Sequence, residues 1–115
     1  MKGCNIKNIV GKKITIIGSG LSGMAAAKLA SYLGANVFIS DKNKISKNFG
    51  QYSKNIKYEE GMHSSRCYDC DFAIISPGIS TDNSFFNAFK SKKIHIISEI
   101  EFAFWFTKST IIAMT

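Results

Sequence analysis

A glycine-rich turn between a strand pattern and a helix pattern constrains the fold of this chain more than any other feature. Residues 13–17 form a β-branched apolar run, and residues 21–33 carry apolar side chains at helical spacing. Between them stand Gly18, Gly20 and Gly23. In this context the first glycine permits a tight turn, the second lets a ligand approach the backbone, and the third lets the helix pack closely on the strand. The pattern predicts the first strand–turn–helix unit of a Rossmann-like domain.

The same turn is a candidate binding site for a diphosphate. The amides at the start of the helix face outward at the positive end of the helix dipole, which favours an anion. Ser19 and Ser22 flank Gly20 and Leu21, and their hydroxyls would add hydrogen-bond donors for the anion. We expect phosphate binding here, and the alternative is a turn with a purely structural role.

Strand and helix patterns alternate along the rest of the chain. Ser98 and Glu101 form a capping box that opens a final helix running through Phe106. Alternation of this kind predicts an α/β fold, a Rossmann-like parallel sheet of about five strands with helices on both faces. The remaining expected strands are 36–40, 56–58, 72–75 and 94–97, a helix is expected at 83–92, and residues 59–69 are expected to be irregular.

Polar residues follow two of these strands. Asp41 and Lys42 end the second strand, 18 residues after the last glycine of the turn in the case of Asp41. Ser76, Pro77 and Gly78 end the fourth strand. The carboxyl ends of parallel strands share one edge of the sheet, where ligands of open α/β sheets bind. We expect Asp41 to hydrogen-bond a ribose or a base and the Ser76 turn to face the same crevice; the alternatives are a capping aspartate and a strand-ending turn.

Composition argues against nucleic acid and membranes as partners. The net charge is +7, but fourteen of the fifteen cations are scattered lysines rather than clustered arginines. No apolar run approaches the roughly 20 residues that a membrane span requires, and the first residues contain no apolar segment of a secretion signal. We expect a cytoplasmic protein.

Cysteine usage and the absence of catalytic patterns point to binding rather than chemistry. Cys67 and Cys70, with His63 and Cys4, could in principle hold zinc, but free thiols in a reducing compartment and no metal are expected. Paired carboxylates, a Ser/His/Asp set and a GxxxxGK[ST] loop are missing from the sequence. We therefore expect no catalytic residue in this chain.

A new apolar β-branched run begins at Thr110, close to the end of the sequence. We expect the chain to be cut at a domain boundary. Residues 1–109 would form the Rossmann-like domain, and residues 110–115 would form the first strand of a second, truncated domain.

The order of these motifs resembles the Mur ligases of peptidoglycan synthesis. The likeness extends over about residues 9–115 and is carried by residues 11–23, Asp41, residues 75–79 and residues 98–102, while residues 111–115 look like the strand before that family's ATP-binding loop. It implies an enzyme of three domains that bind the UDP of UDP-N-acetylmuramoyl-L-alanine, ATP with Mg²⁺, and an amino acid. ATP would phosphorylate the substrate carboxylate, and the amine would attack the acyl phosphate. This fragment would hold no cofactor and would be inactive alone.

Within that resemblance, individual residues match family positions. Leu21 and Ser22 match positions next to the uracil and the diphosphate, Asp41 and Lys42 match positions at the uracil, and Ser76 matches a phosphate contact. The family often carries Thr-Arg after the aspartate, where this chain has Lys42 and Asn43.

Three alternatives stay open from the sequence. The first is the member of the same family that adds L-alanine, although residues 76–79 and 98–101 favour the member that adds D-glutamate. From a different class, an NAD(P)-binding domain of an oxidoreductase or an NAD sensor would use the same glycines and Asp41. A structural module without a ligand is the third.

Overall fold

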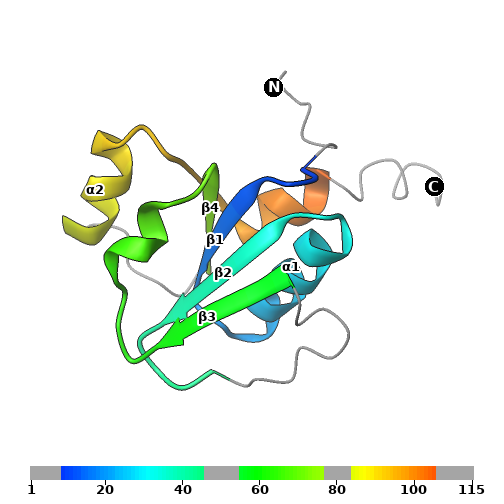
Figure 1. The fold of residues 1–115 in the computed structure, drawn as a ribbon, viewed down its shortest axis with the longest axis horizontal. Helices are drawn as coiled ribbons and strands as arrows, with labels where there is room; N and C mark the ends of the chain where they lie inside the picture. The colour runs from blue at the N-terminus through cyan, green and yellow to red at the C-terminus, as the bar shows by residue number, and fades with distance from the viewer. Residues whose placement is uncertain (1–8, 46–54, 77–83, 106–115) are drawn as a thin grey trace.

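A five-stranded parallel sheet forms the centre of the chain (Figure 1). The computed structural model describes residues 9–45, 55–76 and 84–105. The sheet order is β3-β2-β1-β4-β5, and each neighbouring pair is parallel. The strands are β1 (Lys13–Ile17), β2 (Asn36–Asp41), β3 (Ile56–Glu60), β4 (Phe72–Ile75) and β5 (His95–Ser98). The predicted Rossmann-like sheet is confirmed, and its order reverses between β1 and β4.

Helical segments cover both faces of this sheet, as expected (Figure 1). Helix α1 (Leu21–Tyr32) and the helical residues 99–105 pack on one face, with Ala27, Ala30 and Phe102 fully buried there. The other face is covered by α2 (Ser84–Ser91) and the 3-10 turn η3 (Ser65–Tyr68), which bury Phe89 and Cys67. Two apolar layers therefore sandwich the sheet.

Strand β1 lies at the middle of the sheet and is buried on both faces. Ile14 and Ile16 face the α1 layer and Ile17 faces the α2 layer, all of them at most 1% exposed. Thr15 is equally buried, and its hydroxyl donates to the carbonyl oxygen of Cys67 at 2.9 Å. Because this hydroxyl has a hydrogen-bond partner, burying it lowers the stability of the fold only slightly. This double burial explains why the run contains so many β-branched apolar residues.

Several element boundaries differ from the expected ones. Strand β3 continues to Glu60, and the segment expected to be irregular also contains η3. Strand β5 starts one residue late, at His95, because Lys93 adopts φ 61° and the amide of Ile94 is used to close α2 on the carbonyl of Phe89. Ser98 ends β5 and accepts a hydrogen bond from the amide of Glu101 at 3.0 Å, as the capping box predicts.

Other sequence expectations fall outside the described residues: the helix start at Asn83, Pro77 and Gly78, Phe106, and the run from Thr110. Among the described helices, none has both the length and the apolar character needed to span a bilayer.

Candidate functional site

The glycine turn connects β1 to α1 at the carboxyl edge of the sheet. Gly18 adopts φ 99°, a conformation that side chains disfavour, and its amide donates to the carbonyl of Ser40 at 2.9 Å. A Cβ atom on Gly23 would overlap the carbonyl oxygen of Gly18. These two glycines are therefore required by the fold itself, in the roles predicted for them.

Gly20 differs from its two neighbours in the motif. Its φ of −66° is ordinary, and a Cβ atom there would meet no atom within 4 Å among the described residues. Gly20 is the N-cap of α1, no side chain caps the helix there, and the first turn contains no acidic residue. At the positive end of α1, the described residues thus leave the Cβ position of Gly20 open, which is an arrangement that suits an anion.

The carboxylate of Asp41 is hydrogen-bonded to the glycine turn. Its Oδ2 accepts hydrogen bonds from the backbone amide and the hydroxyl of Ser19 at 2.8 and 2.6 Å, and its Oδ1 accepts one from the amide of Asn43 at 2.8 Å. Burial raises the pKa of Asp41, but these hydrogen bonds and the nearby His63 outweigh it, so the pKa lies below its usual value. The Ser19 hydroxyl, expected as a donor to an anion, donates to Asp41 in the structure.

The other predicted residues converge on the same edge as far as they are described. The amide of Ser76 donates to the carbonyl of Ile17 at 3.2 Å, which sets the end of β4 beside the glycine turn. Leu21 is 94% exposed at the start of α1, and Lys42 is exposed beyond Asp41. The Ser22 side chain, Pro77 and Gly78 lie outside what the structure describes.

Polar residues that the sequence analysis did not select also lie here. Ser40 is buried at the end of β2, and its hydroxyl contacts Glu59 and His63. Glu99 is 5% exposed, and its Oε2 would lie 3.3 Å from a Cβ on Gly23. For the group of Ser40, Glu59 and His63, the one sequence signal is a serine inside a strand that is expected to be buried, because a buried hydroxyl needs a hydrogen-bond partner.

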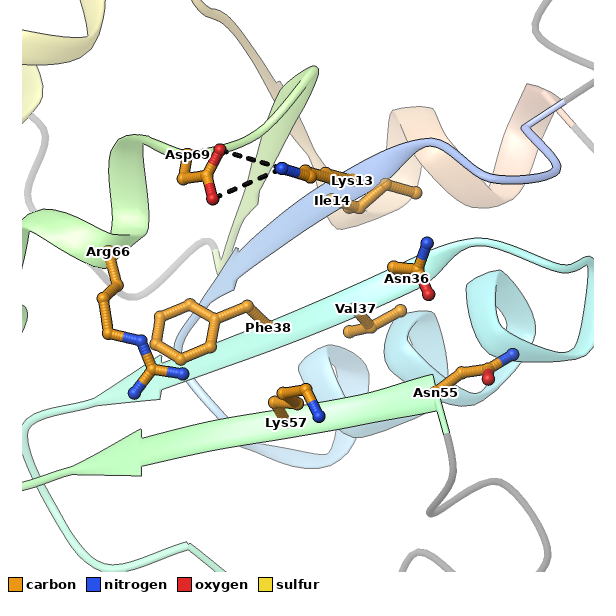
Figure 2. A pocket seen from close by; sticks show the side chains of 9 residues that line it. All are labelled: Lys13, Ile14, Asn36, Val37, Phe38, Asn55, Lys57, Arg66 and Asp69. Atoms are coloured by element: carbon orange, nitrogen blue, oxygen red, sulfur yellow. Dashed lines mark hydrogen bonds and ion pairs between the residues drawn. The ribbon is translucent and has the colours of Figure 1, made fainter.

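A hollow with a volume of about 320 Å³ lies elsewhere on the described surface (Figure 2). It opens over the amino-terminal halves of β1 and β2, at the opposite end of these strands from the glycine turn. Lys13 forms an ion pair with Asp69 at 3.2 Å, and the Arg66 guanidinium lies 4.5 Å from the centre of the Phe38 ring (Figure 2). Lys57 also lines it. The hollow shares none of the predicted site residues.

Cys67 and Cys70 are free thiols. Burial raises the pKa of Cys67 to about 12, and burial also raises the pKa of Cys70. Within residues 9–45, 55–76 and 84–105, no three His, Cys, Asp or Glu side chains are grouped to hold a metal ion. Cys4 lies outside these ranges.

Sequence comparison identifies a family and several relatives of this chain. The family model of the MurD N-terminal domain matches residues 13–85. The UDP-N-acetylmuramoylalanine–D-glutamate ligase of Chloroherpeton thalassium is 42% identical over 113 residues, which are 95% of this chain and 24% of that protein. The enzyme of the same name from Elusimicrobium minutum is 44% identical over 98 residues, 84% of this chain and 21% of that protein. The chain thus spans about a quarter of the length of these relatives.

Solved structures agree on the fold. The crystal structure of a murein peptide ligase from Psychrobacter arcticus superposes with a TM-score of 0.65 at 22% identity, covering 82% of this chain and 20% of that one. The precorrin-2 dehydrogenase SirC superposes with a TM-score of 0.55 at 12% identity, covering 77% of this chain and 45% of that one. From the matched family model and the identities above 40%, the chain belongs to the family of MurD N-terminal domains.

Proposed function

We propose that this chain binds the UDP part of UDP-N-acetylmuramoyl-L-alanine as the N-terminal domain of a D-glutamate-adding ligase. The observation that carries the proposal is the open space that the described residues leave at Gly20, at the start of α1 that no side chain caps and beside the ionised Asp41. Relatives that share more than 40% identity carry the name of that ligase.

The diphosphate would lie over Gly20, where the amides of the first turn of α1 can donate to its oxygens. Leu21 would contact the uridine with its exposed side chain, and Ser76 would approach a phosphate from the end of β4. Asp41 would hydrogen-bond the uridine while still accepting its hydrogen bonds from Ser19. The dipole of α1 and the backbone, rather than a charged side chain, would supply most of the attraction for the anion.

Catalysis would take place with other parts of a longer protein. The 115 residues contain no GxxxxGK[ST] run, so ATP and Mg²⁺ would bind in the central domain, for which residues 110–115 would supply the first strand. The ligase would form an acyl phosphate and couple it to D-glutamate during synthesis of the cell wall. Free Cys67 and Cys70 favour a reducing compartment, and we place the protein in the cytoplasm.

Calorimetric titration of the purified chain tests the proposal. UDP and UDP-N-acetylmuramoyl-L-alanine should bind weakly, and NAD should not bind. Arg66→Ala serves as a matched control, because Arg66 lines the hollow at the opposite end of the sheet, and it should leave UDP binding unchanged. Tight binding of NAD with no response to UDP would replace the ligase assignment with the oxidoreductase alternative.

A further inference from the structure

The hydroxyl of Ser40, the residue before Asp41, lies within hydrogen-bond distance of three oxygen or nitrogen atoms and also interacts with the Cys67 thiol. Its oxygen is 2.8 Å from Oε2 of Glu59, 3.2 Å from the carbonyl oxygen of Met62 and 2.7 Å from Nδ1 of His63. Ser40 is fully buried, so solvent does not replace any of these partners. A hydroxyl has one proton to donate, so the three contacts cannot all receive it.

Counting protons fixes the form of His63. The carboxylate of Glu59 and the carbonyl of Met62 only accept hydrogen bonds. If Ser40 donated to His63, both of these oxygens would face its lone pairs without a proton between them. The remaining arrangement has Nδ1–H of His63 donating to Ser40, and Ser40 donating to Glu59. A neutral His63 therefore carries its proton on Nδ1, and its lone pair is on Nε2.

The same groups attach a loop to the end of β2. Glu59 also accepts from the amide and hydroxyl of Ser64 at 2.7 and 2.6 Å. The amide of Gly61 donates to the carbonyl of Asp41 at 2.8 Å. The loop of residues 61–64 is therefore joined to both β2 and β3 by side chains and by backbone.

This end of β2 in turn carries the glycine turn. The carbonyl of Ser40 accepts from the amide of Gly18 at 2.9 Å, and the carboxylate of Asp41 accepts from Ser19. A short path of hydrogen bonds thus leads from His63 through Ser40 and Asp41 to the turn. The charged groups acting on His63 are Glu59, Asp41 and Lys42.

We propose that His63 is a positioning residue of the nucleotide site: as the Nδ1–H form it fixes the Ser40–Asp41 strand end, and through it the glycine turn. The role as part of a nucleotide site rests on the proposed function, whereas the hydrogen-bonded arrangement does not. Burial outweighs the nearby carboxylates and lowers the pKa of His63, which supports a neutral ring at neutral pH.

The ring form is measurable without any ligand. Nitrogen-15 chemical shifts of His63 at pH 7.5 should show a neutral imidazole protonated on Nδ1. Solvent-exposed His95 in the same sample provides the reference. A ring protonated on Nε2 would overturn the inference whatever the chain binds.

Two substitutions of His63 separate the effect of its Nδ1–H hydrogen bond from the effect of side-chain size. Asparagine places its amide nitrogen at the δ position, where it can replace Nδ1–H, whereas glutamine places it at the ε position. His63→Gln should weaken binding of UDP-N-acetylmuramoyl-L-alanine about tenfold, the value of one net hydrogen bond. His63→Asn should recover most of that loss, and His95→Gln should change nothing.

The outcomes are distinct. Equal affinities for the wild-type chain and His63→Gln, or an equal loss in the asparagine and glutamine variants of equally folded protein, would refute the positioning role. A folded wild-type chain that binds no UDP ligand would refute the proposed function instead, and with it the nucleotide role of His63, even if the ring is protonated on Nδ1.

Discussion

Alanine substitution should mainly reduce stability at Gly23 and mainly reduce ligand binding at Gly20, although the two glycines are only three residues apart. At Gly23 the new Cβ would meet the carbonyl oxygen of Gly18 and lie 3.2 Å from its carbonyl carbon. These are backbone atoms that cannot rotate away. Overpacking costs about 1–3 kcal/mol, with a backbone clash at the upper end, and the better helix propensity of alanine offsets about 1 kcal/mol. The net loss of stability should be about 2 kcal/mol.

At Gly20 the new Cβ would enter open space at an ordinary φ. The loss of stability should stay below about 1 kcal/mol, the usual cost of alanine at an N-cap. The same methyl group would occupy the space where we place the diphosphate oxygens, and the affinity for UDP-N-acetylmuramoyl-L-alanine should fall at least about tenfold, or 1.4 kcal/mol.

Thermal unfolding and calorimetric titration of both variants measure the two effects. Gly23→Ala should lower Tm by about 8 °C, and Gly20→Ala should lower it by less than half of that. If Gly20→Ala binds the UDP ligand as well as the wild type, the diphosphate does not lie over Gly20. If both variants lose the same stability, the packing of the turn differs from the one described.

Three further predictions concern the described core and the polar network. Burial raises the pKa of Glu59, but hydrogen bonds from Ser64 and Ser40 outweigh it, so its contribution to stability is complete above its unfolded value of 4.5 and is lost as the pH falls through the lower folded pKa. In urea unfolding at pH 7 and pH 3, Glu59→Gln should therefore lose less stability on acidification than the wild type; an equal loss would contradict this assignment. The buried thiol of Cys67, with a pKa of about 12, should resist alkylation at pH 8 until the protein unfolds, and rapid labelling by mass spectrometry would contradict its burial. Phe89→Ala should cost about 3–5 kcal/mol in the free energy of unfolding, since Phe89 is fully buried and packs edge-on against Tyr68 at 4.8 Å, and a loss below 1 kcal/mol would show that this layer is not a packed core.

The sheet and the glycine turn were predictable because their causes are local. The β-branched run of residues 13–17 and the apolar spacing of residues 21–33 follow the periods of strand and helix. The roles of Gly18 and Gly23 follow from the absence of a Cβ in a tight turn. None of this requires knowledge of distant contacts, and the structure confirms it.

The polar network was not predictable for the opposite reason. Asp41 contacts Ser19, and Ser40 contacts His63, across 22 and 23 residues of sequence. Residues 59–69 have no apolar period, so the pattern indicates only an irregular segment. Which polar residue of that segment reaches the end of β2 depends on the register of β3 against β2, and the sequence alone does not state that register.

An NMR titration with UDP-N-acetylmuramoyl-L-alanine, followed through the backbone amides, tests the central claim most directly. The amide signals of Ser19, Gly20 and Leu21 should shift in proportion to the bound fraction, together with that of Asp41, while those of Lys57 and Arg66 at the far hollow stay in place. Shifts confined to the hollow, or saturation of the ligand with the turn unaffected, would show that the start of α1 does not hold the diphosphate.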